Sequence, residues 1–174
     1  PFREYTKEQL KTVTPEQAGH HPTWKMGRKI TIDSASFFNK GLEIMEASYL
    51  FGIPGERISV LVHPESIVHS MVEYTDGCNM AQLSRPDMRL AIQYALTYPE
   101  RTPGEFGRLR LEDIGKISFY APDTDKFPAI PMAYEALREG RNLPIVYNGA
   151  NEAAVDMFIR GKIRFDEIAD VVGY

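Results

Sequence analysis

The chain has 174 residues, of which 43% are hydrophobic and 25% charged, a composition typical of a globular protein with one domain or slightly more. Its formal net charge of -4, with both signs interspersed, offers no basic stripe to a nucleic acid or an anionic membrane surface. The single cysteine, Cys78, excludes an internal disulfide and a zinc–cysteine cluster, and no apolar run reaches the roughly 20 residues of a membrane helix.

The first segment, residues 1–29, mixes charge, proline and glycine without a sustained period. Within it, Thr14 and Pro15 predict one short helical turn, because proline is favoured at the first helical position. The stretch 20–29 is predicted to be a loop, and it carries three bulky side chains: His21, Trp24 and Met26. Such a loop is suited to closing over a ligand, although Trp24 could equally anchor it on the core.

A strand and a long helix are predicted next. Residues 30–32, Ile-Thr-Ile, predict a short strand. Ser34 or Ser36 then caps a helix that is expected to run to about residue 51, before Gly52. One face of this helix is apolar and is expected to face the core; its residues are Phe38, Leu42, Met45 and Tyr49.

The predicted helix also carries a polar arc. On a helical wheel with about 100° per residue, four polar side chains fall within about 100°: Ser36, Asn39, Lys40 and Glu43. Lys40 and the helix N-terminus could bind anionic oxygen of a phosphorylated substrate, and Glu43 could ligate a hard divalent cation. The alternative is that Lys40 and Glu43 form an ordinary surface pair, which would contribute only a few tenths of a kcal/mol.

Three strands are predicted to follow, over residues 58–63, 67–74 and 79–83, as an antiparallel ribbon. Asp76-Gly77 predicts a type I′ hairpin between the last two.

Two histidines, His63 and His69, lie on these strands with Pro64 between them. Their spacing matches no zinc motif, so we favour hydrogen-bonded structural roles for both on the pattern alone.

The expected fold class is α+β. Residues 1–98 would form a catalytic domain in which a small, mostly antiparallel sheet packs on helices. Residues 99–125 would form a linker, since they are rich in Pro, Gly, Arg and acids. Residues 126–174 would form a partial helical domain, with helices expected around 132–139, around 151–160 and from Asp166 onward.

Several segments closely resemble the substrate-binding core of the deoxyxylulose-phosphate reductoisomerase family. They are HPTWKMGRKITIDSA at 21–35, NKGLE at 39–43, HPESIVHSMV at 63–72, QL at 82–83 with PDMR at 86–89, and NGANE at 148–152. The blocks stand in the family's order and at about its spacing along essentially the whole chain.

The resemblance implies an NADPH-dependent enzyme, both oxidoreductase and isomerase, of the non-mevalonate isoprenoid pathway. It would convert 1-deoxy-D-xylulose 5-phosphate into 2-C-methyl-D-erythritol 4-phosphate with Mn²⁺, Mg²⁺ or Co²⁺. A homodimer is implied for the full-length protein, with no nucleic acid or membrane partner. We expect a reducing compartment, either the bacterial cytoplasm or a plastid.

The same resemblance implies roles for individual residues. Glu43 would be a metal ligand and, with Lys40 and His21, a catalytic residue. The substrate would be held by His21, Ser34, Asn39, Lys40 and Glu43. Trp24 and Met26 would lie on a flexible lid, and Gly27 would approach the nicotinamide cofactor. His69 and Met88 would line the pocket.

The chain also departs from the family pattern. The family's NADPH domain, its Asp-Ser-Glu metal motif and its phosphate loop precede the first residue here, so only one of three expected metal carboxylates is present. Ser84-Arg85 stands where the family commonly has Gly followed by an acid. We therefore expect a fragment that is inactive alone.

Two alternatives remain open. One is a non-catalytic binding or dimerisation module that pairs its strands edge to edge with a second copy. The other is an unrelated metal-dependent phosphosugar isomerase, which would need Asp33 and Glu46 as further metal carboxylates.

Overall fold

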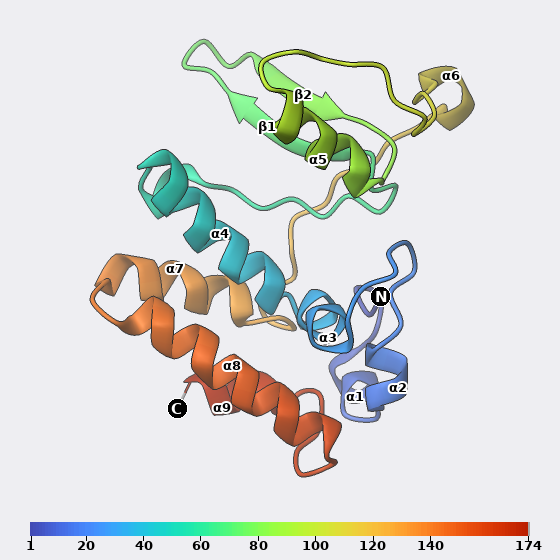
Figure 1. Cartoon of the computed structure of the whole chain (residues 1–174). Helices are drawn as coiled ribbons and strands as arrows, with labels where there is room; N and C mark the ends of the chain where they lie inside the picture. Colours follow the sequence, from blue (N-terminus) through green and yellow to red (C-terminus); the bar gives the residue numbers. More distant parts are fainter. Residues whose placement is uncertain (174) are drawn as a thin grey trace. The chain divides into compact units, whose positions relative to one another are not determined.

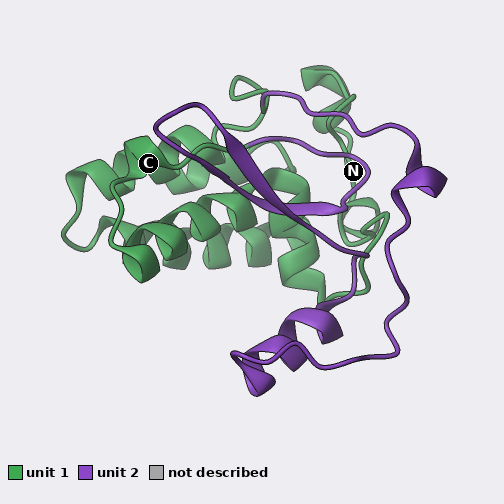
Figure 2. Cartoon of the chain, turned by 90° about the horizontal axis from the view of Figure 1, so that it is seen from above, with its two compact units in different colours: residues 1–60, 122–174 green, residues 61–121 purple. Residues whose placement is uncertain are grey.

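Helices make up most of the structure, a computed structural model that describes residues 1–173 (Figure 1). The residues form two compact units, one of residues 1–60 and 122 onward and the other of residues 61–121 (Figure 2). The predicted class, α+β with a small antiparallel sheet, is confirmed. No helix among residues 1–173 combines the length and apolar character that a membrane crossing requires.

Unit 1 is helical. Its elements are α1 (Lys7–Leu10), α2 (Pro15–Ala18), α3 (Arg28–Ser36), α4 (Phe38–Phe51), the 3-10 turn η1 (Gly55–Arg57), α7 (Ala129–Glu139), α8 (Leu143–Ile159) and α9 (Ile168–Gly173). Helix α4 packs on α7 and α8, while α8 also packs on α9 and α3 (Figure 1). Because these helices from both ends of the sequence share one core, the packing divides the chain differently from the predicted segments 1–98, 99–125 and 126–174.

The short helices begin where the sequence supplies caps. The Thr14 hydroxyl accepts a hydrogen bond from the Gln17 N–H at 3.3 Å, and the Gln17 side chain accepts one from the Thr14 N–H at 2.9 Å. This capping box, with Pro15 at the first helical position, confirms the predicted turn, which is α2.

The predicted strand at residues 30–32 is wrong, because these residues belong to α3. β-branched residues favour strands, but here Thr31 and Ile32 are buried in the helical core at 1% and 0% exposure. The Thr31 hydroxyl donates to the Gly27 carbonyl at 2.8 Å, which satisfies it within the first turn. Tertiary burial therefore outweighs the local preference.

The single helix predicted from Ser34 or Ser36 to residue 51 is also wrong, because Phe37 separates α3 from α4. Phe37 has a left-handed backbone, with φ 69° and ψ 5°. A positive φ is strained for an aromatic residue, so packing must hold it. Its ring lies 4.8 Å from that of Phe127, centroid to centroid.

The helices after residue 126 follow the prediction in part. α7 ends at Gly140, which has φ 66°, as predicted. α8 ends before Gly161 as predicted, but it starts at Leu143 rather than near residue 151, and α9 starts at Ile168 rather than at residue 166.

Unit 2 contains β1 (Val68–Glu73), β2 (Asn79–Leu83), α5 (Met88–Thr97) and α6 (Leu111–Ile114). The two strands pair antiparallel, with Met71 opposite Ala81 and Glu73 opposite Asn79. The predicted third strand at 58–63 is wrong, since within it only Val62 forms an isolated bridge, to Tyr120. The described sheet therefore has two strands.

The turn between the strands also differs from the prediction. A type I′ turn needs two residues with positive φ, whereas Gly77, with φ 84°, is the one such residue between β1 and β2. The Gly77 N–H donates to the Tyr74 carbonyl at 2.9 Å and the Tyr74 N–H to the Cys78 carbonyl at 2.8 Å. The connection is therefore longer than a two-residue hairpin.

Candidate functional site

A polar cluster lies on the first two turns of α4. Asn39 Nδ2 donates to Glu43 Oε1 at 2.6 Å, and Lys40 Nζ pairs with Glu43 Oε2. The Lys40 and Glu43 side chains are 42% and 45% exposed, so the cluster is open to solvent. Three of the four side chains of the predicted arc are thus brought together.

Ser36, the fourth member of the predicted arc, is turned away from this cluster. It lies on α3 and is 7% exposed, and its hydroxyl donates to the Ile32 carbonyl at 2.9 Å. The break at Phe37 causes this difference, because the wheel assumed one continuous helix. Ser34, two residues earlier, is half-buried and donates to the Ile30 carbonyl at 2.8 Å. Its oxygen can still accept a hydrogen bond.

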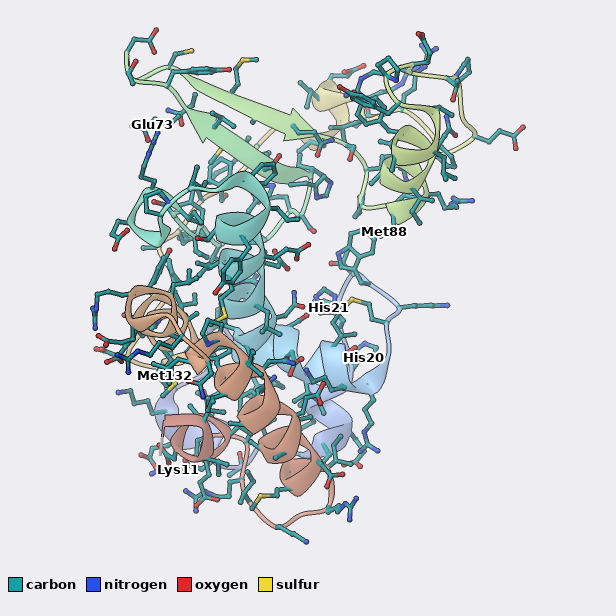
Figure 3. All side chains as sticks on the ribbon, turned by 60° about the vertical axis from the view of Figure 1, so that its left-hand side comes forward. Lys11, His20, His21, Glu73, Met88 and Met132 are labelled. Carbon is teal, nitrogen blue, oxygen red and sulfur yellow. The ribbon has the colours of Figure 1, made fainter. Side chains whose placement is uncertain are left out.

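The loop before α3 is organised by His21 (Figure 3). His21 Nδ1 accepts hydrogen bonds from the Thr23 N–H at 3.1 Å and the Trp24 N–H at 3.0 Å. An acceptor at Nδ1 leaves Nε2 as the protonated nitrogen of the neutral ring. Partial burial lowers the pKa of His21, and the positive charges of the N-terminus and His20 lower it further. The neutral ring, with Nε2 as a donor, is therefore favoured.

The rest of the loop is open. Trp24 is half-buried, and Met26 is 37% exposed. Gly27 is the N-cap of α3, and a Cβ added there would meet no atom within 4 Å. The space beside the Gly27 Cα is therefore open at the N-terminus of α3, and a helix N-terminus attracts anionic groups.

The two remaining predicted residues belong to unit 2. The pairing of β1 and β2 is irregular between Val68 and Ser70, so His69 lies at a bulge, and its Nε2 lies 3.2 Å from the Ser84 carbonyl oxygen. Met88 begins α5 and is 59% exposed (Figure 3). His63 Nδ1 lies 2.9 Å from the Ser118 carbonyl oxygen, in line with the structural role that its pattern favoured.

Few carboxylate side chains in the described residues are placed to bind a metal ion. Within residues 1–173, no group of three or more His, Cys, Asp or Glu side chains is placed to hold a metal ion. Asp33, considered above as a further metal carboxylate, is 2% exposed and bonded to Lys29 and Asn151. It is therefore not available at the surface beside Glu43.

Two surface hollows lie elsewhere, each within one unit. One, of about 310 Å³, lies in unit 2 between Leu83, Arg85 and Phe106. The other, of about 540 Å³, lies in unit 1 between Ser48, Pro54 and Tyr134. None of the predicted site residues lines either hollow.

One residue that positions the polar cluster was not anticipated. Gly41 lies between Lys40 and Leu42 on α4, and a Cβ added to it would lie 2.1 Å from the Tyr147 hydroxyl. That hydroxyl donates to the Ala129 carbonyl at 3.0 Å, so it is held in place. A glycine inside a predicted helix is a known signal of close packing, and the sequence does contain it.

Comparison with known proteins gives family matches along most of the chain. Residues 1–51 match the model "1-deoxy-D-xylulose 5-phosphate reductoisomerase C-terminal domain", and residues 83–174 match "DXP reductoisomerase C-terminal domain". The 1-deoxy-D-xylulose 5-phosphate reductoisomerase of Endomicrobium trichonymphae is 55% identical over 99% of this chain.

Solved structures of reductoisomerases are also similar to this chain. The Zymomonas mobilis reductoisomerase in complex with NADPH is 45% identical, with a TM-score of 0.93 over 99% of this chain and 44% of its own. A DOX-P reductoisomerase in complex with NADPH, fosmidomycin and magnesium is 44% identical, with a TM-score of 0.95 over 99% of this chain and 42% of its own. The chain spans 45% of the length of the Endomicrobium relative.

Proposed function

Because the chain belongs to the 1-deoxy-D-xylulose 5-phosphate reductoisomerase family, we propose that it carries the substrate-binding part of an enzyme that converts this sugar phosphate into 2-C-methyl-D-erythritol 4-phosphate. The whole enzyme would rearrange the carbon skeleton by a retroaldol-type step and reduce the resulting aldehyde with NADPH, and this chain alone would be inactive. The observation that carries the proposal is 55% identity over 99% of the chain to a relative of that name.

The cluster on α4 supports binding of an anionic, hydroxylated substrate. Lys40 supplies a cation and Asn39 an amide donor near the N-terminus of α4, where backbone N–H groups favour anionic oxygen. Ser34 supplies a hydroxyl at the end of the neighbouring helix. In the proposed complex these three groups hold the substrate, largely through its phosphate.

Glu43 fits the role of one ligand to a hard divalent cation such as Mg²⁺, Mn²⁺ or Co²⁺, since it offers half-exposed carboxylate oxygens. When bound, the cation supplies Lewis-acid stabilisation of charge on substrate oxygens. Asn39 and Lys40 occupy only part of the acceptor capacity of Glu43, so its carboxylate can also bind a cation, which would weaken both hydrogen bonds and leave both donors freer for the substrate. The other protein ligands would come from outside this chain.

The loop from His21 to Gly27 is proposed to be a lid. His21 would donate from Nε2 to a substrate oxygen, because its Nδ1 is occupied by the loop's own N–H groups. Trp24 and Met26 would exclude water from the aldehyde before hydride transfer. Gly27 fits an edge of the NADPH, since it has no side chain and no other atom lies within 4 Å of where a Cβ would be. His69 and Met88 would line the pocket.

The direct test is NADPH oxidation with 1-deoxy-D-xylulose 5-phosphate and Mn²⁺. It compares this purified chain with the same chain extended upstream in its reading frame. We expect turnover in the extended protein alone. Absence of turnover in both, with both proteins folded by circular dichroism, would contradict the proposed activity.

A second candidate function is a non-catalytic dimerisation module, and the exposed sheet favours it. β1 is exposed from His69 to Glu73, including Met71 and Val72 at 40% and 56%, and Met80 on β2 is 59% exposed. An exposed edge strand of this sheet can form backbone hydrogen bonds with a strand of a second copy of the chain. The same surface supports a homodimer of the whole enzyme, which we propose for the bacterial cytoplasm or a plastid. Sedimentation of the chain over a range of concentrations tests self-association.

A further inference from the structure

A carboxylate buried in unit 1 joins two helices that lie far apart in the sequence. Asp33, on α3, is 2% exposed. Its Oδ2 lies 2.7 Å from Lys29 Nζ, and its Oδ1 accepts a hydrogen bond from Asn151 Nδ2 at 2.9 Å. A buried charge is costly unless it is paired and hydrogen-bonded, so these partners determine where Asp33 can lie.

The two partners act differently. Lys29 belongs to α3 itself, four residues before Asp33, so their ion pair does not fix α3 against any other helix. Asn151 lies on α8, 118 positions away in the sequence, and it is fully buried. The hydrogen bond from Asn151 therefore fixes the place of Asp33 relative to the core.

The geometry of Asn151 suits this role. A carboxylate only accepts hydrogen bonds, so the amide must present its nitrogen to Asp33. Asn151 Oδ1 is then buried and accepts no hydrogen bond from the described residues. Leucine at this position would remove both the donor and the unsatisfied acceptor at similar volume. Asp33 would keep only Lys29 as a partner, so the variant also loses stability, and a control for that loss is needed.

Asp33 is next to Ser34, the hydroxyl that the proposed function assigns to the substrate phosphate. Because consecutive helical residues are rigidly related, a shift or rotation of α3 at Asp33 displaces Ser34 by a similar amount. α3 continues through Phe37 into α4, which carries Asn39 and Lys40. A contact in the core can thus set the geometry of a group at the surface.

We propose that Asn151 is a positioning residue of the active site. By holding Asp33, it sets the orientation of α3 and presents Ser34 to the phosphate of the sugar substrate. The inference rests on the proposed function, and it adds a residue on α8, outside α3 and α4, to the determinants of substrate affinity.

The test measures binding of 1-deoxy-D-xylulose 5-phosphate to the upstream-extended protein by calorimetry. The variants are Asn151→Leu, Ser34→Ala and the two combined. We expect Asn151→Leu alone to weaken binding about tenfold or more, as loss of an orienting hydrogen bond does in other sites. In the Ser34→Ala background the same change should have little further effect, because Asn151 acts through Ser34.

Val155→Ala is the matched control. Val155 lies on the same helix and is 1% exposed, so its truncation lowers stability to urea without touching Asp33. The control should leave the affinity unchanged. If Asn151→Leu does not fold, the exchanged pair Asp33→Asn with Asn151→Asp restores a donor and an acceptor, and it should bind more tightly than Asp33→Asn alone.

The outcomes separate the two proposals. Unchanged affinity in Asn151→Leu, additive losses with Ser34→Ala, or no recovery in the exchanged pair would overturn the positioning role and leave the proposed function standing. No binding by the unaltered upstream-extended protein, with phosphate-ester ligand in excess, would instead overturn the proposed function, and the positioning role with it.

Discussion

Glu43 is the residue on which the two interpretations of the α4 cluster differ most. As a surface pair, its carboxylate only neutralises Lys40 and accepts from Asn39. As a metal ligand, it would also direct an oxygen lone pair to a cation. The structure contains the hydrogen bonds that the first interpretation needs, and the family membership supports the second.

Glu43→Gln separates the interpretations, since the amide keeps the size of the side chain but loses its charge. We expect Mn²⁺ affinity of the upstream-extended protein to fall at least roughly tenfold, with turnover falling in parallel. Glu46→Gln, an exposed carboxylate on the same helix, is the control and should change neither. Paramagnetic titration of free Mn²⁺ measures the affinity, and an unchanged value in Glu43→Gln would sink the metal role.

His21 leads to a prediction about pH. Its folded-state pKa is lowered from 6.5, so the neutral ring is favoured in the folded chain. The two hydrogen bonds to Nδ1 are therefore present above about pH 6.5. They are lost as the pH falls through the folded pKa, because a proton on Nδ1 removes the acceptor. The loop should then loosen around Trp24.

Trp24 is the chain's only tryptophan, so its fluorescence reports on this loop directly. We expect its emission to change with a midpoint below pH 6.5. His21→Asn should abolish the transition, since an amide oxygen accepts the same N–H groups at every pH. His20→Gln should retain it. A transition that survives in His21→Asn would contradict the assignment.

At the scale of single elements, local sequence signals predicted where helices begin and end better than they predicted whether a segment is a helix or a strand. Pro15 at the first position of α2 and the glycine after α7 each marked a boundary correctly. The strand predicted at residues 30–32 was wrong because β-branched residues favour strands, and the sequence alone does not show which residues they pack against. Asn151, the partner of Asp33 in the core, lies 118 positions away, and no short window along the sequence contains both.

The break at Phe37 shows the same limit for the site. The polar side chains of α4 were predicted correctly because three of them lie within one short stretch of helix. Ser36 was misplaced because a left-handed phenylalanine has no local sequence signal. Its ring packs against Phe127, which lies in another part of the chain.

Two helical glycines give a prediction at this scale. Gly41→Ala should destabilise the protein by about 1–3 kcal/mol, because its Cβ would overlap Tyr147. Gly149→Ala on α8 should instead stabilise it by up to about 1 kcal/mol, since a Cβ there meets no atom within 4 Å. Urea unfolding of both variants measures the free energies.

The role of Tyr147 in this prediction can be checked separately. Burial and the nearby Asp33 carboxylate raise the pKa of Tyr147, so its hydroxyl stays protonated and bonded to Ala129. Tyr147→Phe removes the atom that lies 2.1 Å from the added Cβ, although the ring carbon at 2.9 Å remains. Part of the cost of Gly41→Ala should therefore be recovered in the double variant. If Gly41→Ala lowers the free energy of unfolding equally with and without Tyr147→Phe, a contact other than the one with the Tyr147 hydroxyl restricts the space beside α4.

For the whole molecule, membership of the reductoisomerase family was predictable from motifs in order along the chain, whereas the distribution of burial was not. Of the buried apolar side chains, Ile67 lies in unit 2 and all the others lie in unit 1. The sequence of unit 2 is not markedly polar, and its apolar residues, such as Met80, Ile92 and Leu96, are simply exposed. A pattern of hydrophobic residues predicts that a face will be buried, but it does not show which other residues or which other chain will bury it.

This uneven burial predicts uneven stability. Since local opening is easiest where few apolar contacts are buried, amides of β1, β2 and α5 should exchange with deuterium faster than those of α4 and α8 at neutral pH. Exchange measured by mass spectrometry on peptides from each unit checks this at low protein concentration. If unit 2 becomes protected as the concentration rises, a second copy covers its exposed faces, which favours the dimerisation proposal. If it is protected equally at every concentration, the link from burial to stability fails for this chain.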